Sequence, residues 1–143
     1  VTRIEAAVVA ANGLPFNFTL TARCENYVRG IFDLDDTIAR LQAYEAAGAD
    51  VLMAPGLPDL DSVQRVCSAL HKPVNFMVGI PGRSFTVADL AAAGVKRISL
   101  ATSLYNSALA ATLAAAREIM DSGTFGYLER SLPGSELAAF LKD

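Results

Sequence analysis

Apolar and polar residues recur along this chain at two different periods, and these periods predict strands and helices in turn. In residues 16–23 the apolar Phe16, Phe18 and Leu20 alternate with polar neighbours, which predicts a β-strand. Three further strands are predicted at residues 49–54, 73–78 and 95–101. The first of these three is a continuous apolar run, which is typical of strands buried on both faces of a parallel sheet.

Between the strands, apolar residues recur at helical spacing. Helices are predicted at residues 2–12, 37–47, 59–70, 86–93 and 104–120, with a last short helix that ends at Leu141. The acidic residues 33–36 precede one of them, where carboxylates can cap backbone N–H groups and meet the positive end of the helix dipole. We therefore interpret this acidic run as a helix start, although it superficially resembles a metal cluster.

Four successive strand–helix units predict right-handed crossovers and a parallel sheet. Four units are also half of a (β/α)8 barrel, which takes about 250 residues in all. An open sheet of this size leaves two long edges unpaired, so a half barrel needs its other half or a partner chain. We predict an α/β fold and a single domain over residues 1–143. A flavodoxin-like domain is the alternative, but the chain has no recognisable cofactor loop for it.

Composition narrows the function. The net charge is −3 and the twelve basic residues are scattered, so nothing predicts a nucleic-acid surface. No apolar run reaches the roughly 18 residues of a membrane span, and no basic and then apolar leader opens the chain; a cytoplasmic protein is the default expectation. The two cysteines form no CxxC motif and are interpreted as buried thiols.

Polar residues at the carboxyl ends of the predicted strands are the candidate site, because ligands of parallel α/β proteins bind there. Arg23 ends the first strand and offers paired, permanently charged donors to a planar oxyanion; its alternative role is an ion pair with Glu25. Glu25 and Asn26 could orient that arginine or cap a helix. Asn75 lies in an otherwise apolar strand, where it needs a substrate or backbone partner. Ser99 ends the last strand and adds a hydroxyl donor.

An ordered series of motifs closely resembles the isocitrate lyase/phosphoenolpyruvate mutase superfamily, and within it the small phosphonomutase-like bacterial members. The similarity runs from about Phe16 to Phe125 and is carried by Thr21-Ala22-Arg23-Cys24-Glu25-Asn26 and by residues 33–52, 54–57, 72–75 and 94–99. The resemblance implies a (β/α)8 barrel enzyme that binds a magnesium-stabilised α-keto acid enolate and makes or breaks a C–C or P–C bond. The chain would supply the fifth to eighth strands, the C-terminal half of the barrel.

The resemblance also implies a set of roles and partners. Arg23 would be catalytic and hold a substrate carboxylate or phosphonate, with Glu25, Asn26, Asn75 and Ser99 as further substrate-binding residues. Mg²⁺ (or Mn²⁺) is expected for the full-length enzyme, with its ligands in the other half and none in this chain. The chain alone is therefore expected to be inactive, and the full protein to be a homo-oligomer that exchanges its C-terminal helix.

One position departs from the family pattern. Many relatives have a histidine or glutamate at the end of the second of these strands, where this chain has Pro55. Proline has no titratable group, so the departure weighs against isocitrate or methylisocitrate cleavage and against the mutase reaction itself. The alternative function is a non-catalytic half barrel that binds an anion or serves assembly.

Overall fold

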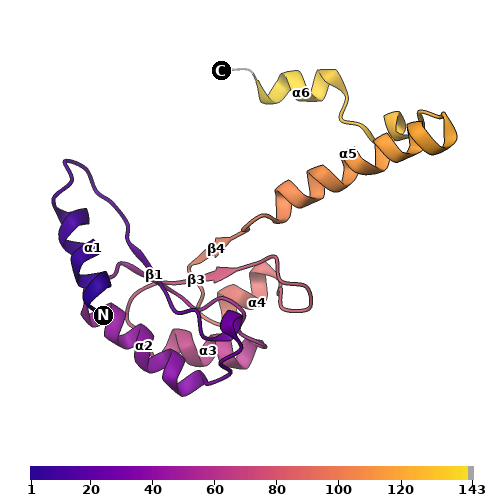
Figure 1. Cartoon of the computed structure of the whole chain (residues 1–143). Helices are drawn as coiled ribbons and strands as arrows, with labels where there is room; N and C mark the ends of the chain where they lie inside the picture. Colours follow the sequence, from indigo (N-terminus) through magenta and orange to yellow (C-terminus); the bar gives the residue numbers. More distant parts are fainter. Residues whose placement is uncertain (142–143) are drawn as a thin grey trace. The chain divides into compact units, whose positions relative to one another are not determined.

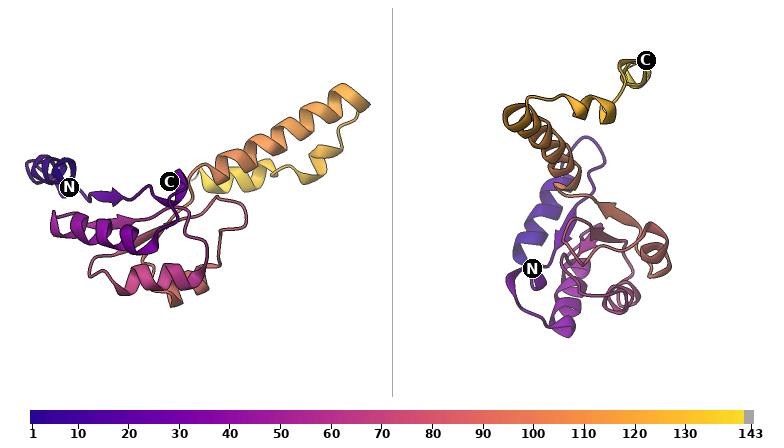
Figure 2. Two further views of the ribbon diagram at one scale, coloured as in Figure 1. Left: turned by 60° about the horizontal axis from the view of Figure 1, so that its bottom comes forward. Right: turned by 90° about the vertical axis from the view of Figure 1, so that its right-hand side faces the viewer.

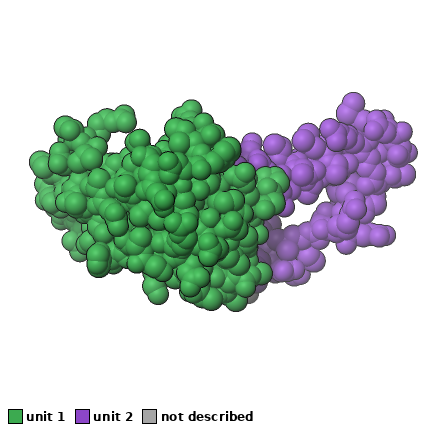
Figure 3. All heavy atoms as spheres, turned by 90° about the horizontal axis from the view of Figure 1, so that it is seen from below, with its two compact units in different colours: residues 1–101 green, residues 102–143 purple. Residues whose placement is uncertain are grey.

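The computed structural model describes residues 1–141, and their contacts group into two compact units (Figure 3). The first, residues 1–101, is called the sheet unit here, and the second, from Thr102 onward, the helical unit. The sheet unit contains α1 (Thr2–Asn12), β1 (Thr21–Arg23), the 3-10 turn η1 (Tyr27–Arg29), α2 (Leu34–Ala46), β2 (Val51–Met53), α3 (Leu60–Ser68), β3 (Val74–Met77), α4 (Val87–Ala92) and β4 (Arg97–Ser99). The helical unit contains α5 (Ser103–Ser122), η2 (Gly126–Arg130) and α6 (Gly134–Phe140). The prediction of one domain over residues 1–143 stays a prediction.

The four strands form one parallel sheet in the order β1-β2-β3-β4, with each strand beside the next along the chain (Figure 1). Helices α2, α3 and α4 lie on one side of it, as both views of Figure 2 show. The buried cluster between them joins strand residues to helix residues: Ala22, Leu52, Val74 and Phe76 from the strands, and Leu41, Val63, Val66 and Leu90 from the helices. The predicted alternation of strands and helices is confirmed, and apolar burial under the helices is what holds the sheet.

The first strand is shorter than predicted. We predicted residues 16–23, but the ladder to β2 begins at Thr21, which pairs with Val51. Phe16 and Phe18 are 61% and 51% exposed. An extended segment becomes a strand only where a neighbour accepts its hydrogen bonds, and β2 begins only at Val51. The alternation in residues 16–20 therefore has the period of a β-strand, but no neighbouring strand pairs with this segment.

Side-chain caps start the three helices that cover the sheet. Asp33 accepts a hydrogen bond from the backbone N–H of Asp36 at 2.9 Å, and Asp59 accepts one from Ser62 at 2.8 Å. Thr86 accepts one from the N–H of Asp89 at 3.1 Å. The acidic residues 33–36 thus begin α2, as predicted, because a carboxylate satisfies N–H groups that have no partner within the helix.

In the helical unit, α5 is the predicted alanine-rich helix, extended by a residue or two at each end. It ends at Gly123, whose φ of 64° is the left-handed conformation that favours glycine. Glu118 then accepts hydrogen bonds from Thr124 Oγ1 and from the N–H of Gly126, which fastens the following turn to the helix. Across residues 1–141 no helix, α5 included, is both long enough and apolar enough to cross a membrane.

Candidate functional site on the inner face of the sheet

The face of the sheet opposite α2, α3 and α4, called the inner face here, carries polar side chains. Successive side chains of a strand point to opposite faces, so where Ala22, Phe76 and Ile98 pack under the helices, their strand neighbours lie on the inner face. These neighbours line a concavity of about 380 Å³: Thr21, Arg23, Met53, Asn75, Met77, Arg97, Ser99 and Ala101. All of them belong to the sheet unit.

Three other hollows are larger, at about 640, 680 and 400 Å³. The first follows the 11–19 loop, the second lies beside α5 and the third lies beside α3 and α4. None of them contains a residue that the sequence marked as a candidate. The inner face is the better site because it lies at the carboxyl ends of parallel strands and gathers three of the five predicted residues, Arg23, Asn75 and Ser99.

Arg23 is the last residue of β1, and its side chain is 49% exposed. Its Nε donates a hydrogen bond to Glu25 Oε1, and the second oxygen of Glu25 lies 3.7 Å from Nε of Arg29. The ion pair that we considered as an alternative role for Arg23 is therefore present. Within residues 1–141 this pair involves Nε alone, so it orients the guanidinium and leaves both Nη nitrogens for a planar oxyanion.

Asn75 lies within β3 and is only 2% exposed. Ser99 Oγ donates to Asn75 Oδ1 at 3.0 Å, which joins the two predicted residues across neighbouring strands. The acceptor of this amide is thus used within the protein, and its donor Nδ2 has no protein acceptor within residues 1–141. The pair presents an N–H donor on the same face as Arg23, separated from it by Met53 of β2, where an oxygen-rich ligand would need one.

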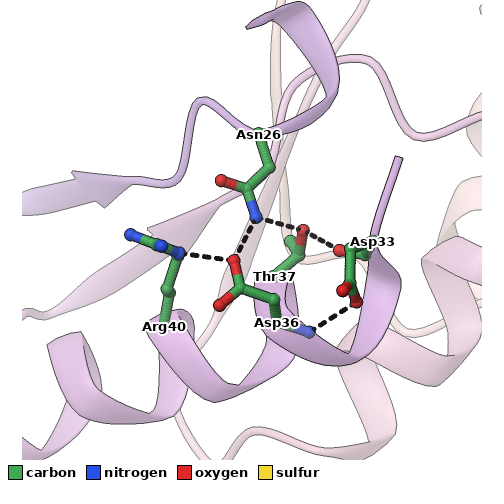
Figure 4. Close-up of polar contacts among 5 residues, drawn as sticks. All are labelled: Asn26, Asp33, Asp36, Thr37 and Arg40. Carbon is green, nitrogen blue, oxygen red and sulfur yellow. Dashed lines mark hydrogen bonds and ion pairs between the residues drawn. The ribbon is translucent and has the colours of Figure 1, made fainter. Parts of the chain in front are cut away.

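Asn26 lies elsewhere, although it is close to Arg23 in sequence. It is 6% exposed, and its Nδ2 donates to Asp36 Oδ2 at 2.8 Å and to Thr37 Oγ1 at 3.1 Å (Figure 4). Thr37 donates in turn to the carbonyl of Asp33 at 2.6 Å. Both amide hydrogens therefore hold the loop after β1 against the start of α2. A substrate-binding role for Asn26 stays a prediction, and only its Oδ1 is left for it.

Asp36 is the charged centre of this second cluster. Arg40 Nε donates to Asp36 Oδ2 at 2.6 Å, and this hydrogen bond, followed by that from Asn26, lowers the pKa of the Asp36 carboxyl. The same ion pair raises the pKa of Arg40. Donors that favour the carboxylate form explain both directions. The Asp36 side chain is 41% exposed, so its pairing with Arg40 is worth little by itself.

Sequence reasoning missed Arg97 as a site residue. Arg97 is in register with Asn75, and its Nη1 donates to Thr21 Oγ1 on β1 at 3.2 Å. The signal was present in β4, because Arg97 and Ser99 flank the partly buried Ile98. That alternation puts Arg97 on the same face as the predicted Ser99.

The described residues do not gather a metal site. Within residues 1–141 no three side chains among histidine, cysteine, aspartate and glutamate come close enough to hold an ion. The His71 side chain is 96% exposed, and its Nδ1 lies 3.4 Å from Glu45 Oε2. Glu45 accepts the backbone N–H of His71 at 2.8 Å, so its role is to hold the turn before β3.

Comparison with known proteins identifies the family of this chain. Residues 1–120 match the family model described as phosphoenolpyruvate phosphomutase. The crystal structure of a "putative lyase/mutase" from Burkholderia cenocepacia J2315 is 50% identical, with a TM-score of 0.92, over 99% of this chain and 51% of that chain. Oxaloacetate decarboxylase 2 of Pseudomonas fluorescens (strain Pf0-1) is 40% identical over 101 residues, which are 70% of this chain and 33% of that protein. Oxaloacetate acetylhydrolase in complex with oxalate is 25% identical, with a TM-score of 0.80, over 95% of this chain and 47% of that chain.

The fold defines the class: four parallel strand–helix units that match about half of a TIM-type barrel shared by lyase-, mutase- and hydrolase-type proteins. The chain belongs to the phosphoenolpyruvate mutase family, within the phosphoenolpyruvate mutase/isocitrate lyase superfamily. It spans about half the length of the Burkholderia structure. The predicted family and the predicted half-barrel fold are both confirmed.

Proposed function

We propose that this chain supplies the C-terminal half of a lyase or mutase-type enzyme that acts on a small α-keto acid, or its carboxylate or phosphonate derivative, through an enolate. The observation that carries the proposal is the inner face, where Arg23 and the Asn75–Ser99 pair line one concavity at the carboxyl ends of the strands. The name of the Pseudomonas relative, an oxaloacetate decarboxylase, supports a keto acid as the substrate class.

The chemistry of these side chains suits an anionic substrate that gains charge as it reacts. The Nη nitrogens of Arg23 bind a carboxylate or phosphonate by two parallel hydrogen bonds, and Glu25 holds the guanidinium in place for it. When negative charge develops on the enolate oxygen, a fixed cation nearby stabilises it without further rearrangement. Asn75 Nδ2 donates to a neighbouring substrate oxygen, and Ser99 holds the orientation of that amide.

Mg²⁺ or Mn²⁺ belongs to this proposal for the full-length enzyme only. The described residues offer no group of three ligands for a divalent ion, and the two charged residues that line the concavity are both arginines. We therefore assign no metal ligand to residues 1–141 and derive no step through a metal. The 143-residue chain alone is expected to be inactive.

Pro55 limits the types of reaction that this site can catalyse. It directly follows Ala54 at the end of β2 and is fully buried. The position thus offers neither a general acid nor a general base at that strand end, which favours chemistry that needs no proton transfer there, such as loss of CO₂ from a β-keto acid. Cytoplasmic location and homo-oligomeric assembly remain predictions alongside this function.

The test is Arg23→Ala in the full-length protein, assayed with oxaloacetate and Mg²⁺. We expect kcat/KM to fall by about 100-fold or more, the size of effect seen when one stabilising donor is removed from a developing oxyanion. Arg65→Ala is the matched control, because Arg65 forms an exposed ion pair with Asp35 at 2.9 Å on the helical side of the sheet. An unchanged kcat/KM in Arg23→Ala would contradict the proposal.

The alternative is a non-catalytic anion-binding or assembly module, and the same reagents distinguish it from the enzyme. It is favoured by the lack of a metal cluster in residues 1–141. Under either hypothesis, calorimetric titration of the full-length protein with oxaloacetate, with and without Mg²⁺, should show binding. Consumption of oxaloacetate supports the enzyme, and binding without consumption supports the module.

A further inference from the structure

Arg97 is a cation on the inner face that has no ion pair within residues 1–141. Its contact there is the hydrogen bond from Nη1 to Thr21 Oγ1, a neutral acceptor, at 3.2 Å. The residues that line the concavity include two cations, Arg23 and Arg97, and no carboxylate. Arg23 has Glu25, which Arg29 shares. Arg97 alone thus lacks a counter-charge on this face.

The backbone of Arg97 is in register with Asn75, but its guanidinium reaches toward the amino ends of the strands, below the proposed substrate site. Arg97 precedes Ser99 by two residues on β4, and it meets Thr21, which precedes Arg23 by two residues on β1. Because the strands are parallel, this contact with Thr21 is displaced toward the amino end of β1, away from Arg23. The guanidinium therefore belongs to the layer below the one proposed to hold substrate.

This layer becomes interior when the barrel is closed. The interior of a (β/α)8 barrel is filled by layers of inward-pointing side chains and is a packed core without a pore. Arg97, which is exposed in the described chain, would then lose its water. Removing a guanidinium from water without a counter-charge costs several kcal/mol, and proteins meet this cost by pairing the charge with a carboxylate that is itself hydrogen-bonded.

We propose that the other four-stranded half of the barrel, which closes over the inner face, places an inward-pointing carboxylate against Arg97, so that a buried ion pair joins the two halves. The inference rests on the proposed closed barrel and does not depend on the reaction that it catalyses. The partner is thus a half barrel with an acidic residue in the layer below its ligand site. Thr21 fixes the direction of the guanidinium toward it.

The experiment uses the full-length protein with three substitutions, Arg97→Met, Arg97→Lys and the surface control Arg65→Met, and measures urea unfolding from pH 5 to pH 8. At pH 8 we expect Arg97→Met to lower the midpoint by about 1 M or more, because it leaves a buried carboxylate without a partner. Arg97→Lys should lose less, since it keeps the charge. Arg65→Met should shift the midpoint little at any pH, because the Arg65 side chain is 52% exposed.

The pH series distinguishes an orphaned carboxylate from lost packing. A buried acid without a counter-charge has a folded-state pKa above its unfolded value, so its penalty is absent below the unfolded pKa and grows as pH rises toward the folded pKa. The deficit of Arg97→Met should therefore shrink between pH 8 and pH 5. If this variant does not accumulate at pH 8, the proposal expects it to be recovered folded at pH 5.5, and failure there overturns it.

Two other results also overturn the proposal. One is a deficit for Arg97→Met that does not change with pH, or no deficit at all. The other is unchanged stability with a raised Kd for oxaloacetate, which would make Arg97 a ligand-binding residue. Neither depends on Arg23→Ala, whose activity tests the proposed function separately.

Discussion

Asn26 and Asn75 are both buried amides on the sheet unit, but their surroundings differ. The donor nitrogen of Asn26 is fully used by Asp36 and Thr37, two residues at the start of α2. Asn75 uses its acceptor oxygen for Ser99 and keeps its donor for the concavity. Burial of a polar side chain therefore did not distinguish structure from function. The two amides differ in which group remains within the described residues: Asn75 keeps its donor Nδ2, and Asn26 keeps only its acceptor Oδ1.

The largest effect on stability is expected from Asn26→Leu in the full-length protein. The change removes both donors and leaves Thr37, which is fully buried, without the hydrogen bond that its hydroxyl accepts. Loss of such a buried partner costs about 1–3 kcal/mol. Urea unfolding should show this loss, while the Kd for oxaloacetate of the remaining folded protein should stay unchanged. A change in Kd larger than the change in stability would place Asn26 in the binding site.

Asn75→Ala should show the opposite division. We expect the Kd for oxaloacetate to rise by about tenfold, which corresponds to about 1.4 kcal/mol of lost hydrogen bonding. The expected loss of folding stability is smaller, about 0.5–1.5 kcal/mol, because only the hydrogen bond with Ser99 is broken within the protein. Calorimetric titration and urea unfolding measure the two quantities. Ser99→Ala is the comparison variant: it breaks the same bond but keeps the Asn75 amide, so its Kd should rise less than that of Asn75→Ala.

The smallest effect concerns pH. The pKa of Asp36 is lowered in the folded state, first by the hydrogen bond from Arg40 and then by that from Asn26. A depressed pKa means that the carboxylate contributes stability above its unfolded pKa, near 3.8, and that this contribution is lost as pH falls through the lower folded value. Asp36→Asn should therefore flatten the acid limb of the stability profile below about pH 4. An unaltered acid limb would contradict the assigned cause.

Much of the fold could be predicted because its signals are local. The alternation of periods located four strands and the helices between them, and Asp33 was identified as the start of α2 from its place before an apolar stripe. The predicted start of the first strand, at residue 16, was wrong, because β1 begins at Thr21. Its alternation was correct, but whether a segment joins a ladder depends on a neighbouring strand, and β2 begins only opposite Thr21.

The candidate site could be predicted in part. Arg23, Asn75 and Ser99 were identified because polar residues at the ends of apolar strands are conspicuous, and the structure brings them to one concavity. Arg97 was missed because a charged residue at a strand edge resembles an ordinary surface residue. Its contact with Thr21 spans 76 residues of sequence, and no local pattern contains that information.

The sequence by itself determined the alternation of strands and helices and the caps, which depend on residues close together along the chain, and the family, which depends on an ordered series of short motifs. Only the tertiary structure decided which polar groups the protein uses itself. Parallel register placed Asn75 beside Ser99 and Arg97 within reach of Thr21, while the loop after β1 turned Asn26 toward α2. Hydrogen-bonding capacity is settled by neighbours in space, and those neighbours come from strands and helices far apart in sequence.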